Sequence, residues 1–432
     1  MKIQVVVVGA GACGLVAALA ARDAGAEVVI IERDSSPSGS TALSSGFVPA
    51  APTRFQRSSD SAELMASDIQ RKNHGEANGR IVDAVCRASG PAIEWLADRH
   101  GIPFQLVEGF LYPGHSVERM HCVPEKTGAA LMACLLNACK DVDILTSARV
   151  SHVDDKSVKF ERPDGSNEEV EYGSLVLACS GFGGNKAMVK QHLPEIADAL
   201  YFGHTGNQGD AIRWGAELGA AVAGMSAYQG HGSVATPHGI LITWALMIEG
   251  GIQVNERGER FTNEHVGYSE ACLPVLRQPG RVAWCVYDQR LHELGMTFPD
   301  YQEAHRAGAV KKDPSFPLLN ETLAKVRSHA TGGQQDPFGR TFKTPLVPPY
   351  YAIKVTGALF HTQGGLVVDE KARVLDAKGR PLPNLFAGGG AACGLSGGHV
   401  WGYLSGNGLL SAVVLGRIAG TQAAQRPQAA MR

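Results

Sequence analysis

The N-terminal segment of the chain alternates between patterns typical of buried strands and of helices. Residues 3–8, "IQVVVV", are mostly β-branched and show no polar alternation, which predicts a parallel strand buried on both faces. A glycine-containing turn follows, and the apolar run after it predicts a helix. The segment "AEVVIIE" then predicts a second buried strand that ends at Glu32. This order predicts a β-α-β unit at the start of the chain.

The turn between the first strand and the helix carries glycines in the spacing G-x-G-x-x-G. Gly9 permits a tight turn, Gly11 lets the backbone approach a pyrophosphate, and Gly14 lets the helix pack closely on the strand. The unpaired N–H groups at the helix N-terminus would bind phosphate, and Glu32 would accept hydrogen bonds from ribose hydroxyls. The sequence therefore predicts a dinucleotide site that comprises Gly9, Gly11, Ala12, Cys13, Gly14, Glu32 and Arg33.

The segment after Glu32 indicates which dinucleotide is bound. An NAD-binding domain would continue with another strand and helix, whereas this chain continues with a small, hydroxyl-rich loop, "RDSSPSGSTALSSGFVPA". Two later strands, within residues 174–185 and 380–394, run into glycine turns where the backbone would approach a ribityl chain and a pyrophosphate. These features favour FAD. Further contacts to FAD are expected from Ser40, Thr41, Ser45, Gly46, Val150, Gly181, Asp210, Gly388 and Gly389.

The overall composition narrows the classes of function. Hydrophobic residues make up 44% and charged residues 19% of the 432 residues, which predicts a large buried core. The net charge of −2, without a basic stripe, argues against nucleic-acid binding. No apolar run approaches the roughly 20 residues that cross a bilayer, so no transmembrane segment is expected. The nine cysteines are scattered without metal-ligand spacing, which predicts reduced thiols in a cytoplasmic protein and no metal site.

Several segments along nearly the whole chain resemble one flavoprotein superfamily. They are "TGNQGDAIRWGAELGA" (205–220), "GGIQVNERGERFTNEH" (250–265), residues 350–389 and "SGNGLLSAVVLGRIAG" (405–420). Together with the N-terminal glycines, they resemble the fumarate reductase/succinate dehydrogenase flavoproteins, which include the 3-ketosteroid dehydrogenases. The resemblance implies an α/β fold, in which a discontinuous Rossmann-like FAD-binding domain (1–225 and 346–432) holds an inserted α+β cap domain (226–345).

The resemblance also implies details of the flavin site. The loop "SGSTALSSG" lacks the histidine that carries covalent flavin in succinate dehydrogenases, so we expect non-covalent FAD. The final helix would point its N-terminus at the flavin, whose negative charge in the reduced form it would favour. Contacts are expected there from Ser405, Asn407, Gly408 and Leu409.

Residues 296–349 are rich in Pro, Gly and polar residues, which predicts a loop-rich part of the cap.

Four positions depart from the fumarate reductase pattern. Those enzymes carry a catalytic arginine four residues beyond the Glu of R-F-x-N-E, and this chain has Tyr268 there. They hold a substrate carboxylate with an arginine in the motif H-G-x-N-R-L-G-G-N, and this chain has Tyr403 there. Trp244 and Met247 stand where the family has a proton-relay Glu and Arg. Since an arginine fork is the natural clamp for a carboxylate, the site is poorly suited to fumarate or succinate.

The resemblance to ketosteroid dehydrogenases implies a different chemistry for the two tyrosines. In those enzymes one tyrosine takes the proton α to a ketone, while another, with a backbone N–H, polarises the carbonyl. We therefore expect an FAD-dependent dehydrogenase of a CH–CH bond beside a ketone, with Tyr268 as the base and Tyr403 as the donor. His231 and His399 match the family's substrate-contacting histidines and are expected to be catalytic. The remaining residues expected in the substrate pocket are Tyr112, His361 and Gly402.

Three alternatives remain open at this point. The protein could act on carboxylates, as fumarate reductase or tricarballylate dehydrogenase does, with Arg119, Arg257 or Arg260 supplying the missing charge. It could run the same chemistry backwards as an ene reductase, or it could bind flavin without catalysis. Besides a small-molecule substrate, an enzyme of this kind needs an external electron acceptor, which we expect to be oxygen, a quinone or a partner protein.

Overall fold

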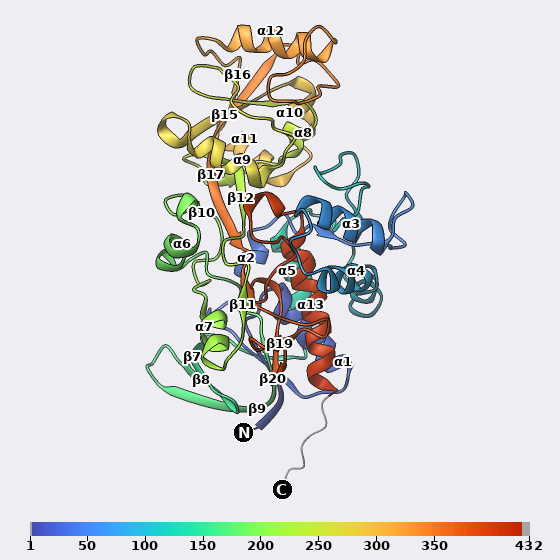
Figure 1. The fold of residues 1–432 in the computed structure, drawn as a ribbon, viewed down its shortest axis with the longest axis vertical. Helices are drawn as coiled ribbons and strands as arrows, with labels where there is room; N and C mark the ends of the chain where they lie inside the picture. Colours follow the sequence, from blue (N-terminus) through green and yellow to red (C-terminus); the bar gives the residue numbers. More distant parts are fainter. Residues whose placement is uncertain (1, 426–432) are drawn as a thin grey trace.

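The computed structural model describes residues 2–425 and has two halves, each built around its own sheet (Figure 1). The lower half in Figure 1 contains both ends of the described chain, and the upper half is formed from its middle. The chain therefore leaves the lower half and later returns to it, as a discontinuous domain requires. This confirms the predicted mixed α/β fold.

The lower sheet has eight strands, and its central strands are parallel. Their order is β19-β20-β9-β1-β2-β6, and β7 and β8 join through β9. Strand β1 pairs in parallel with β2 and β9, and the returning strand β20 pairs in parallel with β9. The bounds are β1 Lys2–Val8, β2 Val28–Ile31, β6 Asp143–Leu145, β7 Arg149–Val153, β8 Ser157–Glu161, β9 Asn167–Leu177, β19 Arg373–Leu375 and β20 Pro381–Ala387.

Two helices from opposite ends of the chain pack together in the lower half. They are α1 (Ala12–Asp23) and α13 (Asn407–Ala424). A Cβ atom on Gly420 would lie 2.0 Å from the carbonyl oxygen of Ala17, so the two backbones meet where no larger residue fits. The other helices of this half are α2 Gly39–Ala42, α3 Ala62–Lys72, α4 Gly79–His100, α5 Gly128–Ala138, α6 Lys186–His192 and α7 Asp210–Glu217.

The upper sheet has seven strands arranged around the long strand β17. The order is β13-β12-β17-β15-β14, and β10 and β16 also pair with β17. Figure 1 shows β12 and β17 running from the upper half down to the lower one. The bounds are β10 Leu200–Tyr201, β12 Tyr228–Ala235, β13 Ile240–Leu241, β14 Ile252–Val254, β15 Val282–Asp288, β16 Val310–Lys312 and β17 Tyr350–Thr362. The exact domain boundaries remain a prediction.

The upper half contains more helix than its sequence suggested. Its helices are α8 Ala245–Ile248, α9 Tyr268–Leu276, α10 Gln289–Gly295, α11 Pro299–Arg306 and α12 Leu319–Ala330. The expectation of a loop-rich segment over 296–349 is therefore wrong for its first part. Helix α12 buries Leu319, Leu323 and Val326, whose spacing places them on one face of a helix. Residues 331–349 contain no helix or strand and agree with the expectation.

Two small sheets complete the fold. One joins β3 (Val48–Pro49), β5 (Met120–Cys122) and β4 (Gln105–Leu106), and the other joins β11 (Val222–Ala223) and β18 (Gly365–Leu366). Within residues 2–425, none of the helices combines the length and the hydropathy that crossing a bilayer requires.

Candidate active site

The glycine turn between β1 and α1 forms one end of a long cavity. Gly9 has a φ of +101°, which only glycine adopts easily, and a Cβ atom on Gly14 would lie 1.8 Å from the carbonyl oxygen of Gly9. A Cβ atom on Gly11 would meet only the hydroxyl of Thr41, at 3.7 Å. The turn is therefore closed on the protein side and open beside Gly11, where a phosphate could approach the backbone.

Glu32 lies at the end of β2 and lines the same part of the cavity. One carboxylate oxygen accepts a hydrogen bond from the N–H of Ala10 at 2.7 Å, and the other accepts one from the N–H of Asp34 at 2.9 Å. Each oxygen can accept at least one more hydrogen bond. The carboxylate is thus held in place with lone pairs left for two ribose hydroxyls.

The serine-rich loop around α2 links this end of the cavity to the next part. Ser40 accepts hydrogen bonds from the backbone N–H of His204 and from the side chain of Asn207, and Thr41 accepts one from the N–H of Ala12 at 3.1 Å. Ser40 and Thr41 line both parts of the cavity, which therefore form one continuous channel. An extended dinucleotide with a phosphate at Gly11 and a ribose at Glu32 fits this arrangement.

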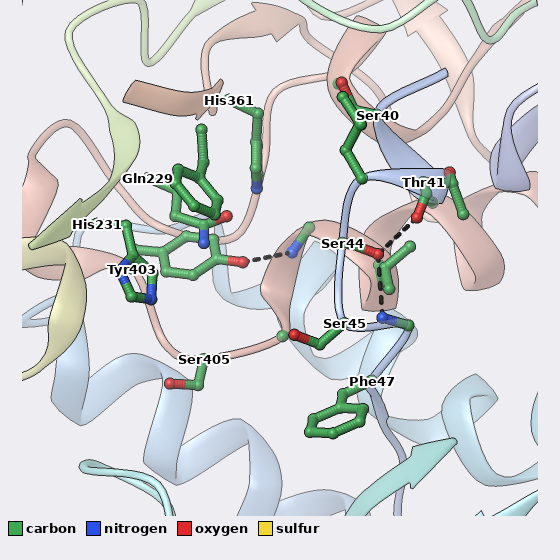
Figure 2. A pocket seen from close by; sticks show the side chains of 18 of the residues that line it. Ser40, Thr41, Ser44, Ser45, Phe47, Gln229, His231, His361, Tyr403 and Ser405 are labelled. Atoms are coloured by element: carbon green, nitrogen blue, oxygen red, sulfur yellow. Dashed lines mark hydrogen bonds between the residues drawn. The ribbon is translucent and has the colours of Figure 1, made fainter. Parts of the chain in front are cut away.

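Three tyrosines meet at the opposite end of the channel. Tyr268 is the first residue of α9, Tyr403 precedes α13, and Tyr112 lies in the loop before β5. The ring centre of Tyr268 lies 6.2 Å from that of Tyr112 and 6.2 Å from that of Tyr403. The hydroxyl of Tyr403 accepts a hydrogen bond from the N–H of Gly408 at 3.3 Å (Figure 2). The upper and lower halves thus bring phenol groups to one place.

Tyr268 and Tyr403 have different surroundings, and these give their hydroxyl groups different pKa values. Burial raises the pKa of Tyr268 to about 12, although hydrogen bonds from Ser405 and Tyr403 lower it in part. Burial raises the pKa of Tyr403 well above its ordinary value, and the neighbouring Tyr268 raises it further. Of the two phenols, Tyr268 therefore gives up its proton more readily, and Tyr403 remains a hydrogen-bond donor.

Two uncharged histidines line the same end of the channel. Burial lowers the pKa of His231 to about 3 and that of His361 to about 4. The Nδ1 atom of His231 accepts a hydrogen bond from the backbone N–H of Ser233 at 3.1 Å, so its proton lies on Nε2. The His231 ring stacks between Tyr268 at 4.7 Å and Phe360 at 5.0 Å, measured between ring centres. These contacts fix the imidazole as a neutral donor.

A family model described as FAD binding domain matches residues 4–409. The chain belongs to this family. The match includes the glycine turn, Glu32 and the start of α13, and it confirms FAD as the cofactor that the channel fits. As expected from the sequence motifs, the chain is a member of the fumarate reductase/succinate dehydrogenase flavoprotein superfamily.

Two curated relatives of this FAD-binding chain are a probable fumarate reductase and an NADH:fumarate oxidoreductase. The chain is 30% identical to a probable fumarate reductase of Shewanella frigidimarina, over 98% of its own length and 75% of the relative. It is 29% identical to the NADH:fumarate oxidoreductase of Klebsiella pneumoniae, again over 98% of its own length but only 48% of the relative.

Two solved structures share the whole fold. The open conformation of a flavocytochrome c3 fumarate reductase matches with a TM-score of 0.81 and 27% identity, over 98% of this chain and 78% of that one. The 3-ketosteroid-Δ4-(5α)-dehydrogenase of Rhodococcus jostii matches with a TM-score of 0.76 and 26% identity, over 98% of this chain and 97% of that one. The protein is accordingly an FAD-dependent oxidoreductase that acts on CH–CH groups.

Most residues expected to contact FAD line the channel. They are Gly9, Gly11, Ala12, Cys13, Glu32, Arg33, Ser40, Thr41, Ser45, Gly46, Val150, Asp210, Gly389, Ser405, Gly408 and Leu409. Four others lie behind its wall. Gly14 and Gly388 pack against Gly9 and Cys13, Gly181 packs against Thr362, and Asn407 is buried beside Ser396. These four shape the wall, and their direct contact with FAD remains a prediction.

Two expected site residues lie elsewhere. His399 does not line the channel: its side chain is 55% exposed, lies 3.5 Å from Glu76 and stacks on Trp401, which stacks on His74. Gly402 packs against Ser396, because a Cβ atom there would lie 2.0 Å from the Ser396 carbonyl oxygen. Of the aromatic residues in "GGHVWGYLSGNG", only Tyr403 reaches the channel. The other rings attach this loop to the segment after α3.

The end of the channel where the three tyrosines meet, which we call the substrate end, carries no formal charge. Among the described residues, no Arg, Lys, Asp or Glu lines it. The arginines that could have replaced the family's pair are engaged elsewhere. Arg119 bonds Asp60 and Asp68 in the core, Arg260 bonds Glu264, and Arg257 is exposed beside Glu259. The lost arginines are therefore not replaced from these segments.

Several residues that line the substrate end of the channel were not predicted from the sequence. Phe202, Phe360 and Gln229 are the main ones. Gln229 lies two residues before His231 in β12, and residues at this spacing point to the same face of a strand. The expectation that His231 faces the substrate therefore contained a signal for Gln229 as well. Phe360 lacks such a signal, because it is adjacent to His361 and both line the channel at a bulge in the β12–β17 pairing.

The buried histidines predict that the FAD-free protein is sensitive to acid. Burial lowers the pKa of His115, His121 and His361 to about 4 and that of His231 to about 3. Below about pH 6.5 the unfolded chain binds more protons at these sites than the folded chain does. The free energy of unfolding therefore decreases as the pH is lowered, by about 1–2 kcal/mol per histidine between pH 6.5 and pH 5. Asp300, whose pKa burial raises to about 6, opposes this by one proton. Urea denaturation should therefore show a lower free energy of unfolding at pH 5 than at pH 6.5, and an equal or higher value would contradict the expectation.

Proposed function

We propose that this protein desaturates an uncharged ketone by removing two hydrogens from the CH–CH bond next to the carbonyl. The uncharged lining of the substrate end supports this most directly. A dicarboxylate would lose its hydration there without a cation to pair with, at a cost of several kcal/mol per ion. A ketone oxygen needs only hydrogen-bond donors, which tyrosine hydroxyls and backbone N–H groups provide.

In this proposal the ketone oxygen binds to the Tyr403 hydroxyl. The Gly408 N–H donates to the oxygen of that hydroxyl at 3.3 Å, which leaves the phenol proton to donate to the ketone oxygen. Negative charge develops on the ketone oxygen as the α proton leaves, and a donor already in place stabilises it. Because Tyr403 keeps its proton at any ordinary pH, it suits this role.

Tyr268 is the proposed base. It has the lower pKa of the two phenols, and Tyr112 packs against its ring. Tyr268 acts in its deprotonated form, after its own proton has passed to solvent. The α carbon loses a proton to this phenolate and the β carbon loses a hydride, so a carbon–carbon double bond forms and the substrate is oxidised by two electrons. Bound FAD supplies the hydride-accepting chemistry. We also propose that an external acceptor, namely oxygen, a quinone or a partner protein, takes up the electrons.

Anaerobic reduction of the flavin tests the proposal. The purified holoenzyme is mixed with cyclic ketones or with succinate and tricarballylate, and the absorbance of oxidised flavin is followed. We expect cyclic ketones to bleach the flavin and yield the α,β-unsaturated product, and we expect the acids to leave it oxidised. Bleaching by the acids alone would contradict the proposal.

The identity to a probable fumarate reductase favours a second candidate, reduction of a carbon–carbon double bond. The same residues would then act in reverse on an unsaturated ketone, or an unsaturated acid would bind with its charge paired from outside the described lining. Reoxidation of the photoreduced enzyme separates these cases. An enone that reoxidises the flavin indicates ketone chemistry in the reducing direction, whereas reoxidation by fumarate alone indicates carboxylate chemistry.

A further inference from the structure

We propose that Gln229 binds a second, uncharged polar group of the substrate, separate from the ketone oxygen. This inference rests on the proposed function and narrows its substrate class. It describes a ketone that also carries a hydroxyl, an amide or another carbonyl. Four observations on the substrate end of the channel support it.

The first is the position of Gln229. It lies in β12 directly opposite His361 of β17. The Cβ atoms of such cross-strand partners lie about 4.5–5.5 Å apart, and their side chains share one face of the sheet. Both residues line the channel, and Figure 2 shows Gln229 among the side chains of His231, His361 and Tyr403. The Gln229 amide is therefore directed at the space that the substrate would occupy.

The second observation is that this amide has no partner. Gln229 is only 9% exposed, yet its side chain makes no hydrogen bond to any of residues 2–425. By contrast, the buried Gln363 accepts a hydrogen bond from the Ser396 hydroxyl at 2.8 Å. The amide faces the cavity, so a ligand that displaces water from it without pairing it would pay about 1–3 kcal/mol, and a group that pairs it gains affinity and selectivity.

The third observation is a second fixed donor on the same strand. The His231 Nε2–H is left for the channel because Nδ1 accepts from Ser233. Gln229 and His231 belong to β12, whereas Tyr403 precedes α13. The channel thus offers hydrogen-bonding groups from two separate segments, one for the ketone oxygen and one for a second group.

The fourth observation is the absence of charge. Along the described lining neither wall carries an Arg, Lys, Asp or Glu side chain, so an ionised second group would be unpaired. An amide offers both a donor and an acceptor, which suits hydroxyl, amide and carbonyl groups alike. The second polar group of the substrate is therefore neutral.

Matched pairs of ligands test the assignment. Each pair consists of a cyclic ketone and the same ketone with a hydroxyl or a second carbonyl, for example cyclohexanone with 4-hydroxycyclohexanone. Binding to the oxidised holoenzyme is measured by the change in flavin absorbance and by calorimetry, and flavin reduction is measured separately. For at least one pair, we expect the wild type to bind the more polar member about tenfold more tightly.

The variant Gln229→Leu, which keeps much of the side-chain volume, should remove this preference. We expect the ratio of the two dissociation constants to approach one. Gln422→Leu makes the same substitution near the end of α13, outside the channel, and should keep the wild-type ratio.

Three results would overturn the assignment. The ratio could be the same in the wild type and in Gln229→Leu, or the wild type could show no preference for a polar member in any pair. Alternatively, Gln229→Leu could change the affinity for FAD or the spectrum of the ligand-free flavin and leave the ratio intact, which would place the amide on the cofactor. If no ketone bound or reduced the wild-type flavin, the proposed function itself would fail. Ketones that react without a Gln229-dependent ratio would overturn this inference alone.

Discussion

Replacing Tyr403 with phenylalanine is expected to lower kcat/KM for a cyclic ketone by about 10²–10³-fold, the usual effect of losing one donor to a developing oxyanion. The aromatic ring would keep its packing, since Tyr403 is buried and its ring lies 5.5 Å from that of His361. Only the hydroxyl beside the Gly408 N–H is lost. The measurements are the rate of anaerobic flavin reduction and the flavin content of the purified variant, which should equal that of the wild type.

A tyrosine outside the channel provides the control. Tyr350 begins β17 at its upper end, and its hydroxyl contacts Arg327 at 3.2 Å. Tyr350→Phe removes the same atom and should retain the wild-type rate. A Tyr403→Phe enzyme that kept its full rate would argue against Tyr403 as the carbonyl donor. Loss of FAD from that variant would instead indicate that the hydroxyl supports the cofactor.

The variant Gly11→Ala is expected to weaken FAD binding by about a hundredfold, equivalent to about 3 kcal/mol, with little change in the stability of the FAD-free protein. Gly11 has an ordinary extended backbone, with φ −77° and ψ −175°. A Cβ atom there would meet only Thr41, at 3.7 Å, so the folded chain has room for it. The methyl group would occupy the space into which we place the pyrophosphate. Titration of the apoprotein with FAD and urea denaturation measure the two effects separately.

Gly79 offers a closely matched control. A Cβ atom there would also meet a single atom at 3.7 Å, in the Gln70 side chain, and Gly79 starts α4 away from the channel. Gly79→Ala should bind FAD as the wild type does. Equal FAD affinity in Gly11→Ala and Gly79→Ala would mean that the pyrophosphate lies elsewhere.

The part of the channel formed by β1, the glycine turn and Glu32 could be predicted, because residues close together in the sequence determine its geometry. Strand β1 is an unbroken apolar run, and Val5, Val6 and Val7 are fully buried between its parallel neighbours. The close contact of Gly14 with the Gly9 carbonyl leaves no room for a side chain at position 14. The spacing of the glycines in the sequence therefore predicts the geometry of the turn. The same holds for Glu32, which must follow the strand to reach the turn.

The substrate end was harder to predict because tertiary contacts decide where its side chains point. In "GGHVWGYLSGNG" the glycines allow almost any direction for the rings. His399 and Trp401 turn to His74 and Glu76, which are distant in the sequence, and only Tyr403 reaches the channel. Local composition also misled at α12, where prolines and glycines on both sides obscured the helical spacing of its buried face.

Strand β17 ties the site to the upper half in a way that constrains its variation. One uninterrupted strand of 13 residues pairs with β15 in the upper sheet and carries His361 near its lower end. Apart from the bulge at Phe360 and His361, side chains alternate along this strand, so inserting a single residue between the part that pairs with β15 and the bulge would turn His361 to the opposite face. Loops and helices at the periphery of the upper half can change length without this effect. The number of residues between the part of β17 that pairs with β15 and His361 is therefore fixed. Variants of this protein would have to keep that number in order to keep the pocket.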